Sequence, residues 1–164
     1  MLQRAESQSH IDARHAIQCD LAAETLRVTG SLQLRVFGGS MLPSVWPGDV
    51  LTIRQAAVSE IKPGELALYA HSGGFMVHRV ARIMADGLIT RGDAHRSDDP
   101  PAMSSQVLGK VAAIQRGRAS FVPKGKLNCS QRLLQLLILH CEEFTTLLLR
   151  LNALRLKLNP GRRA

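Results

Sequence analysis

The chain has 164 residues, a length that suits one folded domain with appendages and is too short for two domains of ordinary size. Hydrophobic residues make up 45% of the sequence and charged residues 21%, a balance that excludes a wholly disordered chain. The formal net charge of +8 is concentrated at one end: residues 110–164 carry 11 basic and 2 acidic side chains, whereas residues 1–109 carry 10 and 11.

The first segment, residues 1–30, is expected to be a helical lead-in. Good helix formers follow Asp20, and the run stops at Gly30, a residue type that commonly ends helices. The first 18 residues mix charges throughout and contain no apolar stretch of the kind found in signal peptides. We therefore expect no cleaved leader, and a cytoplasmic or peripherally membrane-associated chain.

The second segment, residues 31–123, is predicted to be a β-rich domain. Short runs rich in Val, Ile and Leu alternate with Gly, Pro, Asp and Ser, a spacing typical of strands joined by turns. Little helix is expected within it, so the chain as a whole is predicted to be mainly β. The expected strands lie at residues 32–37, 49–54, 65–70, 75–83, 87–92 and 107–114.

The third segment, residues 124–164, is predicted to be a basic amphipathic helical tail. Its apolar residues recur every three or four positions, which places them on one face of a single helix or of a pair of helices. Charged residues such as Glu142 and Arg150 oppose a membrane-spanning helix, because each costs about 2.5–3.5 kcal/mol at the bilayer centre. We expect the tail to pack on the β domain or a second subunit, or to lie on an anionic membrane surface. The expected stripe comprises Leu134, Leu137, Cys141, Phe144, Leu148, Leu151 and Leu158, interrupted by Arg155.

The cysteines and histidines show no metal-binding pattern. Cys19, Cys129 and Cys141 are odd in number, widely spaced and without a CxxC pair, which favours reduced structural thiols. No two histidines share a helical face with a third ligand, and His95 reads as a surface-loop residue that could approach a site nearby. The sequence predicts no metal and no cofactor.

Ser40 stands in an unusual setting for a β-rich region. Gly38 and Gly39 precede it, and glycines let the backbone turn sharply and let a substrate come close. A catalytic serine needs an exposed hydroxyl, a nearby base and backbone N–H groups aimed at the developing oxyanion. Taken alone, however, the glycines and serine also fit a bulge between strands whose hydroxyl bonds locally.

A longer pattern surrounds this serine and continues downstream. It reads G-x-S-M-x-P-x-x-x-x-G-D, followed by Gly64-Glu65 and then His78-Arg79-Val80. These motifs resemble the nucleophile and base segments of the signal peptidase I family and of the related self-cleaving repressor peptidases, and the likeness spans about residues 34–115. The resemblance implies a signal-peptidase-like β domain in which Ser40 is the nucleophile and His78 the general base. The first pattern consists of Gly38, Ser40, Met41, Pro43, Gly48 and Asp49.

The base and an acidic box point to one branch of that family. A histidine base is similar to that of the endoplasmic-reticulum, archaeal and sporulation-type enzymes, where a glycine-aspartate pair precedes one or two further aspartates. Here Asp93 precedes Asp98 and Asp99. The resemblance implies that Asp99 orients His78, with Asp93 or Asp98 either structural or the true third member of the triad.

Two features depart from the resemblance. Family members often carry a serine or threonine where Gly38 stands, so oxyanion stabilisation here would depend on backbone N–H groups of Gly38, Gly39 and Ser40. No transmembrane anchor is recognisable before Ser40, although membrane signal peptidases have one.

The expected function is that of a serine endopeptidase of signal-peptidase type. Its substrates would be peptide or protein precursors with small residues before the cut, or the chain itself. The alternatives are a repressor-like regulatory or self-cleaving module and an inactive peptidase-like protein, with a basic tail that binds nucleic acid or a membrane. Nucleic acid is not an expected partner, because the N-terminal segment offers one helix rather than the two or three of a helix-turn-helix unit and because aromatic residues are only 4% of the chain. An oligomer is compatible with the sequence.

Overall fold

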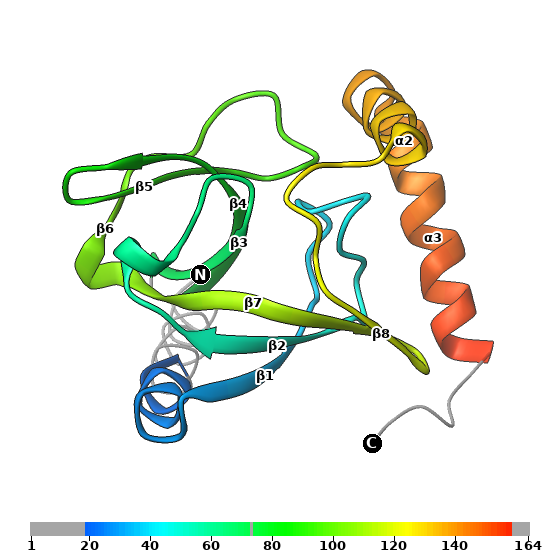
Figure 1. Cartoon of the computed structure of the whole chain (residues 1–164). Coiled ribbons are helices and arrows are strands. Elements are labelled where there is room, and N and C mark those ends of the chain that lie inside the picture. Colours follow the sequence, from blue (N-terminus) through cyan, green and yellow to red (C-terminus); the bar gives the residue numbers. More distant parts are fainter. Residues whose placement is uncertain (1–18, 73, 159–164) are drawn as a thin grey trace, which may run out of the picture.

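The computed structural model describes residues 19–72 and 74–158, which fold around one antiparallel sheet, as Figure 1 shows. The predicted mainly β fold with helices at both ends is confirmed. The eight strands are β1 (Ser31–Arg35), β2 (Val50–Gln55), β3 (Leu66–His71), β4 (Gly74–Met84), β5 (Gly87–Arg91), β6 (Ala102–Met103), β7 (Val107–Arg116) and β8 (Ala119–Phe121).

The strands follow the order β1-β2-β7-β3-β4-β5-β6, with β8 as a further partner of β7. All pairs are antiparallel, and β7 joins the two parts of the sheet by pairing with both β2 and β3. Each of the six predicted strands is present. Strands β6 and β8 were not expected, because two and three residues are too few to show an alternating pattern. Two short 3₁₀ helices, η1 (Val58–Glu60) and η2 (Ser104–Gln106), lie in the connections.

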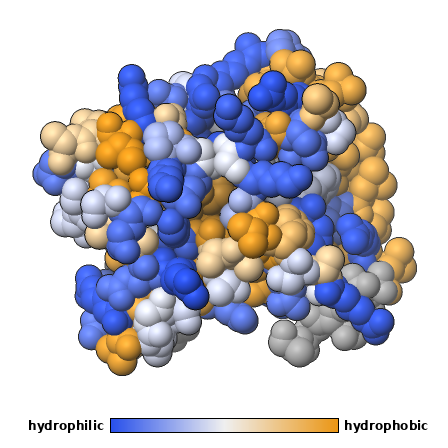
Figure 2. All heavy atoms as spheres, in the orientation of Figure 1, coloured by the Kyte–Doolittle hydropathy of each residue, from blue (hydrophilic) through white to orange (hydrophobic). Residues whose placement is uncertain are grey.

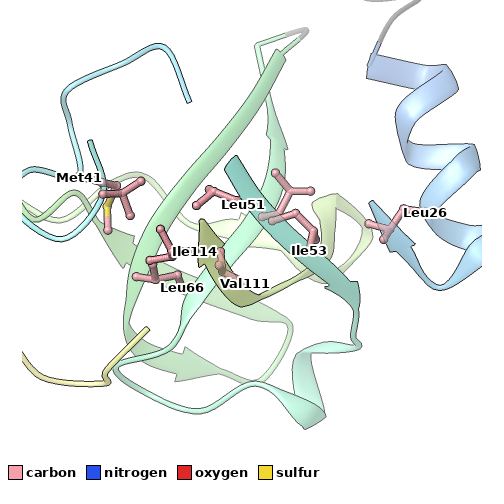
Figure 3. Close-up of a cluster of buried hydrophobic side chains, with 9 residues drawn as sticks. Leu26, Met41, Leu51, Ile53, Leu66, Val111 and Ile114 are labelled. Atoms are coloured by element: carbon pink, nitrogen blue, oxygen red, sulfur yellow. The ribbon is translucent and has the colours of Figure 1, made fainter. Parts of the chain in front are cut away.

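The main hydrophobic core lies between the sheet, the N-terminal helix and the loop that follows β1, as Figure 3 shows. Met41, the residue after Ser40, is only 4% exposed and belongs to this core. Burial of a side chain of this size contributes about 1.5–3 kcal/mol, so it fixes the backbone beside the serine. The buried members are Leu26, Met41, Val45, Leu51, Ile53, Leu66, Leu68, Val111 and Ile114.

The N-terminal helix, residues 19–29 of the described chain, ends at Gly30 as predicted. Gly30 has a φ of +71°, and its N–H donates to the carbonyl of Leu26 at 2.9 Å. This left-handed glycine closes the last turn of the helix. The rest of the expected lead-in, residues 1–18, lies outside the described residues, as do the last six positions of the tail.

The C-terminal segment forms two helices, α2 (Cys129–His140) and α3 (Glu142–Leu158). Asn128 caps α2 by accepting a hydrogen bond from the N–H of Gln131. The chain turns at Cys141, whose backbone is extended with φ −138° and ψ 99°. Within the described ranges, neither helix combines the length and apolar character needed to cross a bilayer.

Of the two arrangements left open by the sequence, the tail forms the pair of helices, but the predicted stripe does not form one buried face. Of the predicted stripe, Leu134, Phe144 and Leu148 are half-buried, whereas Leu137 and Leu151 are exposed. Cys141 and Leu158, also members of that stripe, are exposed too. The predicted stripe therefore mixes half-buried and exposed positions within each helix, and the extended residue at the turn separates the two helices.

Candidate active site

Ser40 lies in the loop between β1 and β2, and this loop is held at its base and in its interior. The N–H of Val36 donates to the carbonyl of Asp49 at 2.9 Å, and the N–H of Gly48 donates back to the carbonyl of Val36 at 2.8 Å. Inside the loop, Leu42 and Val45 are 0% and 1% exposed. Ser40 itself is half-buried. Its hydroxyl is therefore carried by a loop whose base is hydrogen-bonded and whose interior is well packed.

Asp49, the last residue of the predicted nucleophile pattern, stabilises the loop through hydrogen bonds at its C-terminal end. Its carboxylate accepts a hydrogen bond from the N–H of Trp46 at 2.9 Å and three from Arg116, the shortest at 2.7 Å. Arg116 also donates to the carbonyl of Ser44 at 3.0 Å. The charge of Asp49, which is 3% exposed, is therefore matched by an arginine, and its role is structural.

His78 reaches the serine from the middle of the sheet. It lies on β4 opposite Ala67 of β3, and it is 1% exposed. Its Nε2 is 2.9 Å from the Oγ of Ser40, although 38 positions separate the two residues. This is hydrogen-bond distance, and it allows the imidazole to take the hydroxyl proton directly.

Asp99 completes the arrangement on the other side of the imidazole. Its Oδ2 lies 2.6 Å from the Nδ1 of His78. The N–H of Asp99 donates to the carbonyl of Thr90 at 2.8 Å. This bond ties residues 92–99, which we call the acidic loop, to β5. A carboxylate on Nδ1 selects the tautomer whose Nε2 is free to accept a proton from the serine.

Two residues on neighbouring strands hold the Asp99 carboxylate, and sequence reasoning missed both. The hydroxyl of Thr90 on β5 donates to Oδ2 at 2.8 Å, and the hydroxyl of Tyr69 on β3 lies 3.4 Å from the same oxygen. Thr90 is 0% exposed and Tyr69 3%. Burial raises the pKa of Tyr69, which keeps its hydroxyl protonated beside the carboxylate. The only available signal was that both positions fall in predicted strands on either side of the predicted strand that carries His78.

Asp93 is held away from His78 by an arginine. Its two oxygens each accept a hydrogen bond of 2.8 Å from Arg79, and the hydroxyl of Ser44 also donates to it. Arg79 further donates to the carbonyls of Gly64 and Lys124, at 2.7 and 2.9 Å. Arg79, to which no role was assigned from the sequence, thus ties β4 to the segments around Gly64, Asp93 and Lys124. The Asp93 carboxylate that it binds is 5% exposed.

Asp98 lies at the surface, where it forms ion pairs with Arg82 at 3.3 Å and Arg91 at 3.5 Å. The structure therefore separates the three aspartates that the sequence left open. Asp99 contacts the imidazole, whereas Asp93 and Asp98 are committed to arginines. The expectation that either of these two could be the third member of the triad is set aside.

The residues expected to bind the oxyanion are consecutive in the loop that carries the serine. Gly38 is exposed, while Gly39 and Ser40 are half-buried. Among the described residues, no acceptor receives a hydrogen bond from the amides of Gly39 or Ser40, whereas the carbonyl of Ser40 is fixed by the N–H of Ala94 at 2.9 Å. These two amides remain available to a charged oxygen that develops beside Oγ.

Gly92 is packed directly against the site. A Cβ at this position would lie 2.7 Å from the carbonyl oxygen of Ser40 and 3.2 Å from the Nε2 of His78. Only a residue without a side chain lets the acidic loop approach the serine and the histidine this closely.

His95 lies beside His78 but is exposed. Its ring meets that of His78 edge-on, with centroids 5.4 Å apart. Ligand atoms of His78, His95 and Asp99 lie within 4.8 Å of one another, so this trio could approach a metal ion. Both ring nitrogens of His78 are already engaged, however, one with Asp99 and one with Ser40. The absence of a metal stays a prediction from the sequence.

The assembled site is a serine hydroxyl, an imidazole and a carboxylate in hydrogen-bond contact, on a rigid loop and the central strands of the sheet. Comparison of the chain with protein-family models finds no match, and comparison with curated proteins finds none either.

Proposed function

We propose that this protein is a serine endopeptidase that uses Ser40 as nucleophile, His78 as general base and Asp99 to orient the base. The observation that carries the proposal is the continuous contact from Ser40 Oγ to His78 Nε2 at 2.9 Å and from His78 Nδ1 to Asp99 Oδ2 at 2.6 Å. A glycine-rich bulge whose serine bonds locally would not require a buried histidine and a carboxylate in line with the hydroxyl.

The reaction follows from these contacts. Oγ of Ser40 attacks the carbonyl carbon of a peptide bond while Nε2 of His78 takes the hydroxyl proton. The amides of Ser40 and Gly39 stabilise the oxyanion, and the imidazolium is stabilised by Asp99. His78 then gives its proton to the leaving amine, and the C–N bond breaks to leave an acyl ester on Ser40. Water attacks the ester with His78 again as the base, which releases the acid product and restores the serine.

Substrate class is suggested by the resemblance to the signal peptidase I family. Members of that family cleave precursors that bind in an extended conformation with small residues before the cut. We infer the same class here, and the chain itself is one such candidate. The 2.9 Å contact between base and nucleophile favours an active enzyme over an inactive relative, since a relic site has no need to keep this distance.

The test is cleavage of a proteome-derived peptide library, with new N-termini identified by mass spectrometry. The wild-type protein, a Ser40→Ala variant and a Ser105→Ala variant are compared, and Ser105 is an exposed serine of η2 that serves as the matched control. We expect cuts after small residues with wild type and Ser105→Ala, and none with Ser40→Ala. Self-cleavage is followed in the same samples from the intact mass of the chain.

Cuts that persist in the Ser40→Ala variant would assign the activity to another group or to a contaminant. Absence of any Ser40-dependent cut, in the library and in the chain itself, would contradict the proposal.

A further inference from the structure

Both helices of the α2–α3 hairpin carry exposed leucines. On α3, Leu147, Leu151, Leu154 and Leu158 are spaced by four, three and four positions, so they share one helical face. Their exposed fractions are 53%, 54%, 55% and 79%. On α2, three leucines at the same kind of spacing are also exposed. We call these seven residues the leucine face: Leu133, Leu136, Leu137, Leu147, Leu151, Leu154 and Leu158.

Figure 2 shows apolar atoms gathered along the edge of the molecule where the hairpin lies in Figure 1. Isolated exposed leucines are common on protein surfaces and need no explanation. Seven on two adjoining helices form an extended apolar surface, and such surfaces mark sites of interaction with a protein or a membrane.

The hairpin is attached to the peptidase body through its other face. Gln135 of α2 donates to the carbonyl of Asp93 at 2.7 Å, and Asn152 of α3 donates to the carbonyl of Pro47 at 2.8 Å. A methyl group of Leu149 lies 3.5 Å from the point where a side chain on Gly39 would begin. The described part of the chain therefore fixes the hairpin beside the nucleophile loop and leaves the leucine face uncovered.

Basic residues flank this face on both sides. Arg150 and Lys157 lie seven positions apart along one flank of the α3 leucines, and Arg155 lies on the other. The acidic residues of α3 occupy only its first turn. Long basic side chains beside an apolar stripe suit an anionic bilayer, because the stems stay in the interface while the charges reach the lipid headgroups.

A second copy of the chain fits this face less well. Two copies joined through the α3 leucines would bring the arginines and lysines that flank each stripe close to one another, and like charges at short range destabilise such a contact. An anionic lipid surface turns the same charges into an attraction.

We propose that the α2–α3 hairpin lies on the surface of an anionic lipid bilayer, with the leucine face in the interface and the helices parallel to the membrane plane. The contact of Leu149 with Gly39 would then hold Ser40 next to the bilayer, within reach of precursors at the membrane. Membrane binding stands without the proposed activity, whereas the placement of a catalytic serine at the membrane rests on it.

The experiment is flotation of the full-length protein with vesicles of phosphatidylcholine alone or mixed with phosphatidylglycerol. We expect the protein to float with the anionic vesicles and much less with the neutral ones. The double variant Leu151→Gln/Leu154→Gln should bind about tenfold more weakly, because it removes apolar area from the interface. Glutamine is a good helix former, so the fold is kept, and circular dichroism checks this. Leu21→Gln is the matched control, because Leu21 is 65% exposed on the N-terminal helix, away from the hairpin.

Charge and catalysis are separated by two further variants. Arg150→Gln/Lys157→Gln should weaken binding to anionic vesicles and reduce its sensitivity to salt. Ser40→Ala should float like wild type, so that loss of peptidase activity and loss of membrane binding are distinguishable. Failure of the wild-type protein to bind anionic vesicles would overturn the proposal. So would a leucine variant that binds vesicles normally, or one that only converts a dimer to a monomer in sedimentation.

Discussion

The hydroxyl of Thr90 donates to the same Asp99 oxygen that contacts the imidazole of His78, at 2.8 Å and 2.6 Å respectively. The carboxylate is thus held from β5 as well as from β4. Because the threonine is fully buried in the sheet, it fixes the direction from which Asp99 meets the histidine. The third residue of the site is on a loop, but its orientation is determined by the sheet.

A Thr90→Val variant should therefore lose activity while keeping its fold. Valine has nearly the same shape as threonine but cannot donate, and a hydrogen bond to a charged group contributes about 1.5–3 kcal/mol. We expect kcat on a cleaved library peptide to fall about tenfold with little change in KM. Thr90→Ser keeps the hydroxyl and should restore most of kcat. If Thr90→Ser is as impaired as Thr90→Val, the effect arises from packing and not from the hydrogen bond.

A Gly92→Ala variant should disrupt the site sterically. The added methyl group would lie 2.7 Å from the Ser40 carbonyl oxygen, which is backbone and cannot move without shifting Ser40. A misplacement of this kind by about 1 Å can cost on the order of a hundredfold in rate. The control is Gly38→Ala, where a Cβ meets nothing within 4 Å. The measurement is kcat/KM for both variants, and equal activity would show that the acidic loop adjusts freely.

Much of the fold could be predicted because the strands are long enough to display their alternation. Strand β4 spans 11 residues and β7 spans 10, and both appear in the apolar pattern. The two-residue β6 carries no such signal. The turn at Cys141 was missed for a related reason: apolar residues continue at helical spacing on both sides of it, so periodicity alone cannot locate the break.

The candidate site was predictable only in part. Ser40 and His78 were identified from motifs, and Asp99 was the first choice to orient the histidine. Asp93 and Asp98 stayed open as alternatives, since all three aspartates lie within residues 93–99. The choice depends on which arginines are near, and this is decided by sheet order. The contacts of Thr90 and Tyr69 with Asp99 likewise follow from the sheet order, because β5 and β3 lie on either side of β4.

Loss of the Arg79 side chain should destabilise the protein strongly. Arg79→Met would leave Asp93, which is 5% exposed, buried without its cation, and breaking a buried ion pair in this way costs about 3–5 kcal/mol. The free energy of unfolding in urea measures the effect. Arg82→Met is the control, because its ion pair with Asp98 is mostly exposed and such pairs contribute about 0–1 kcal/mol. Similar losses for the two variants would contradict the structural role given to Asp93.

Tyr69 should make the protein lose stability in alkaline solution. In the unfolded chain a tyrosine ionises near pH 10, whereas burial raises the pKa of Tyr69 in the folded protein. Below the unfolded value both states hold the proton and this contribution to stability is complete. Above it the unfolded chain releases the proton first, so the free energy of unfolding falls as pH rises toward the folded pKa.

The measurement is urea unfolding of wild type and Tyr69→Phe from neutral pH to about pH 11, beyond the unfolded tyrosine pKa. Other groups also titrate there, so the expected result is a steeper alkaline decline for wild type than for the variant. Tyr69 is the single tyrosine of the chain, so the near-ultraviolet absorbance of tyrosinate follows its ionisation alone in the folded protein. Parallel declines, or a tyrosinate signal that rises at the pH of a free tyrosine, would show that the hydroxyl is not held protonated beside Asp99.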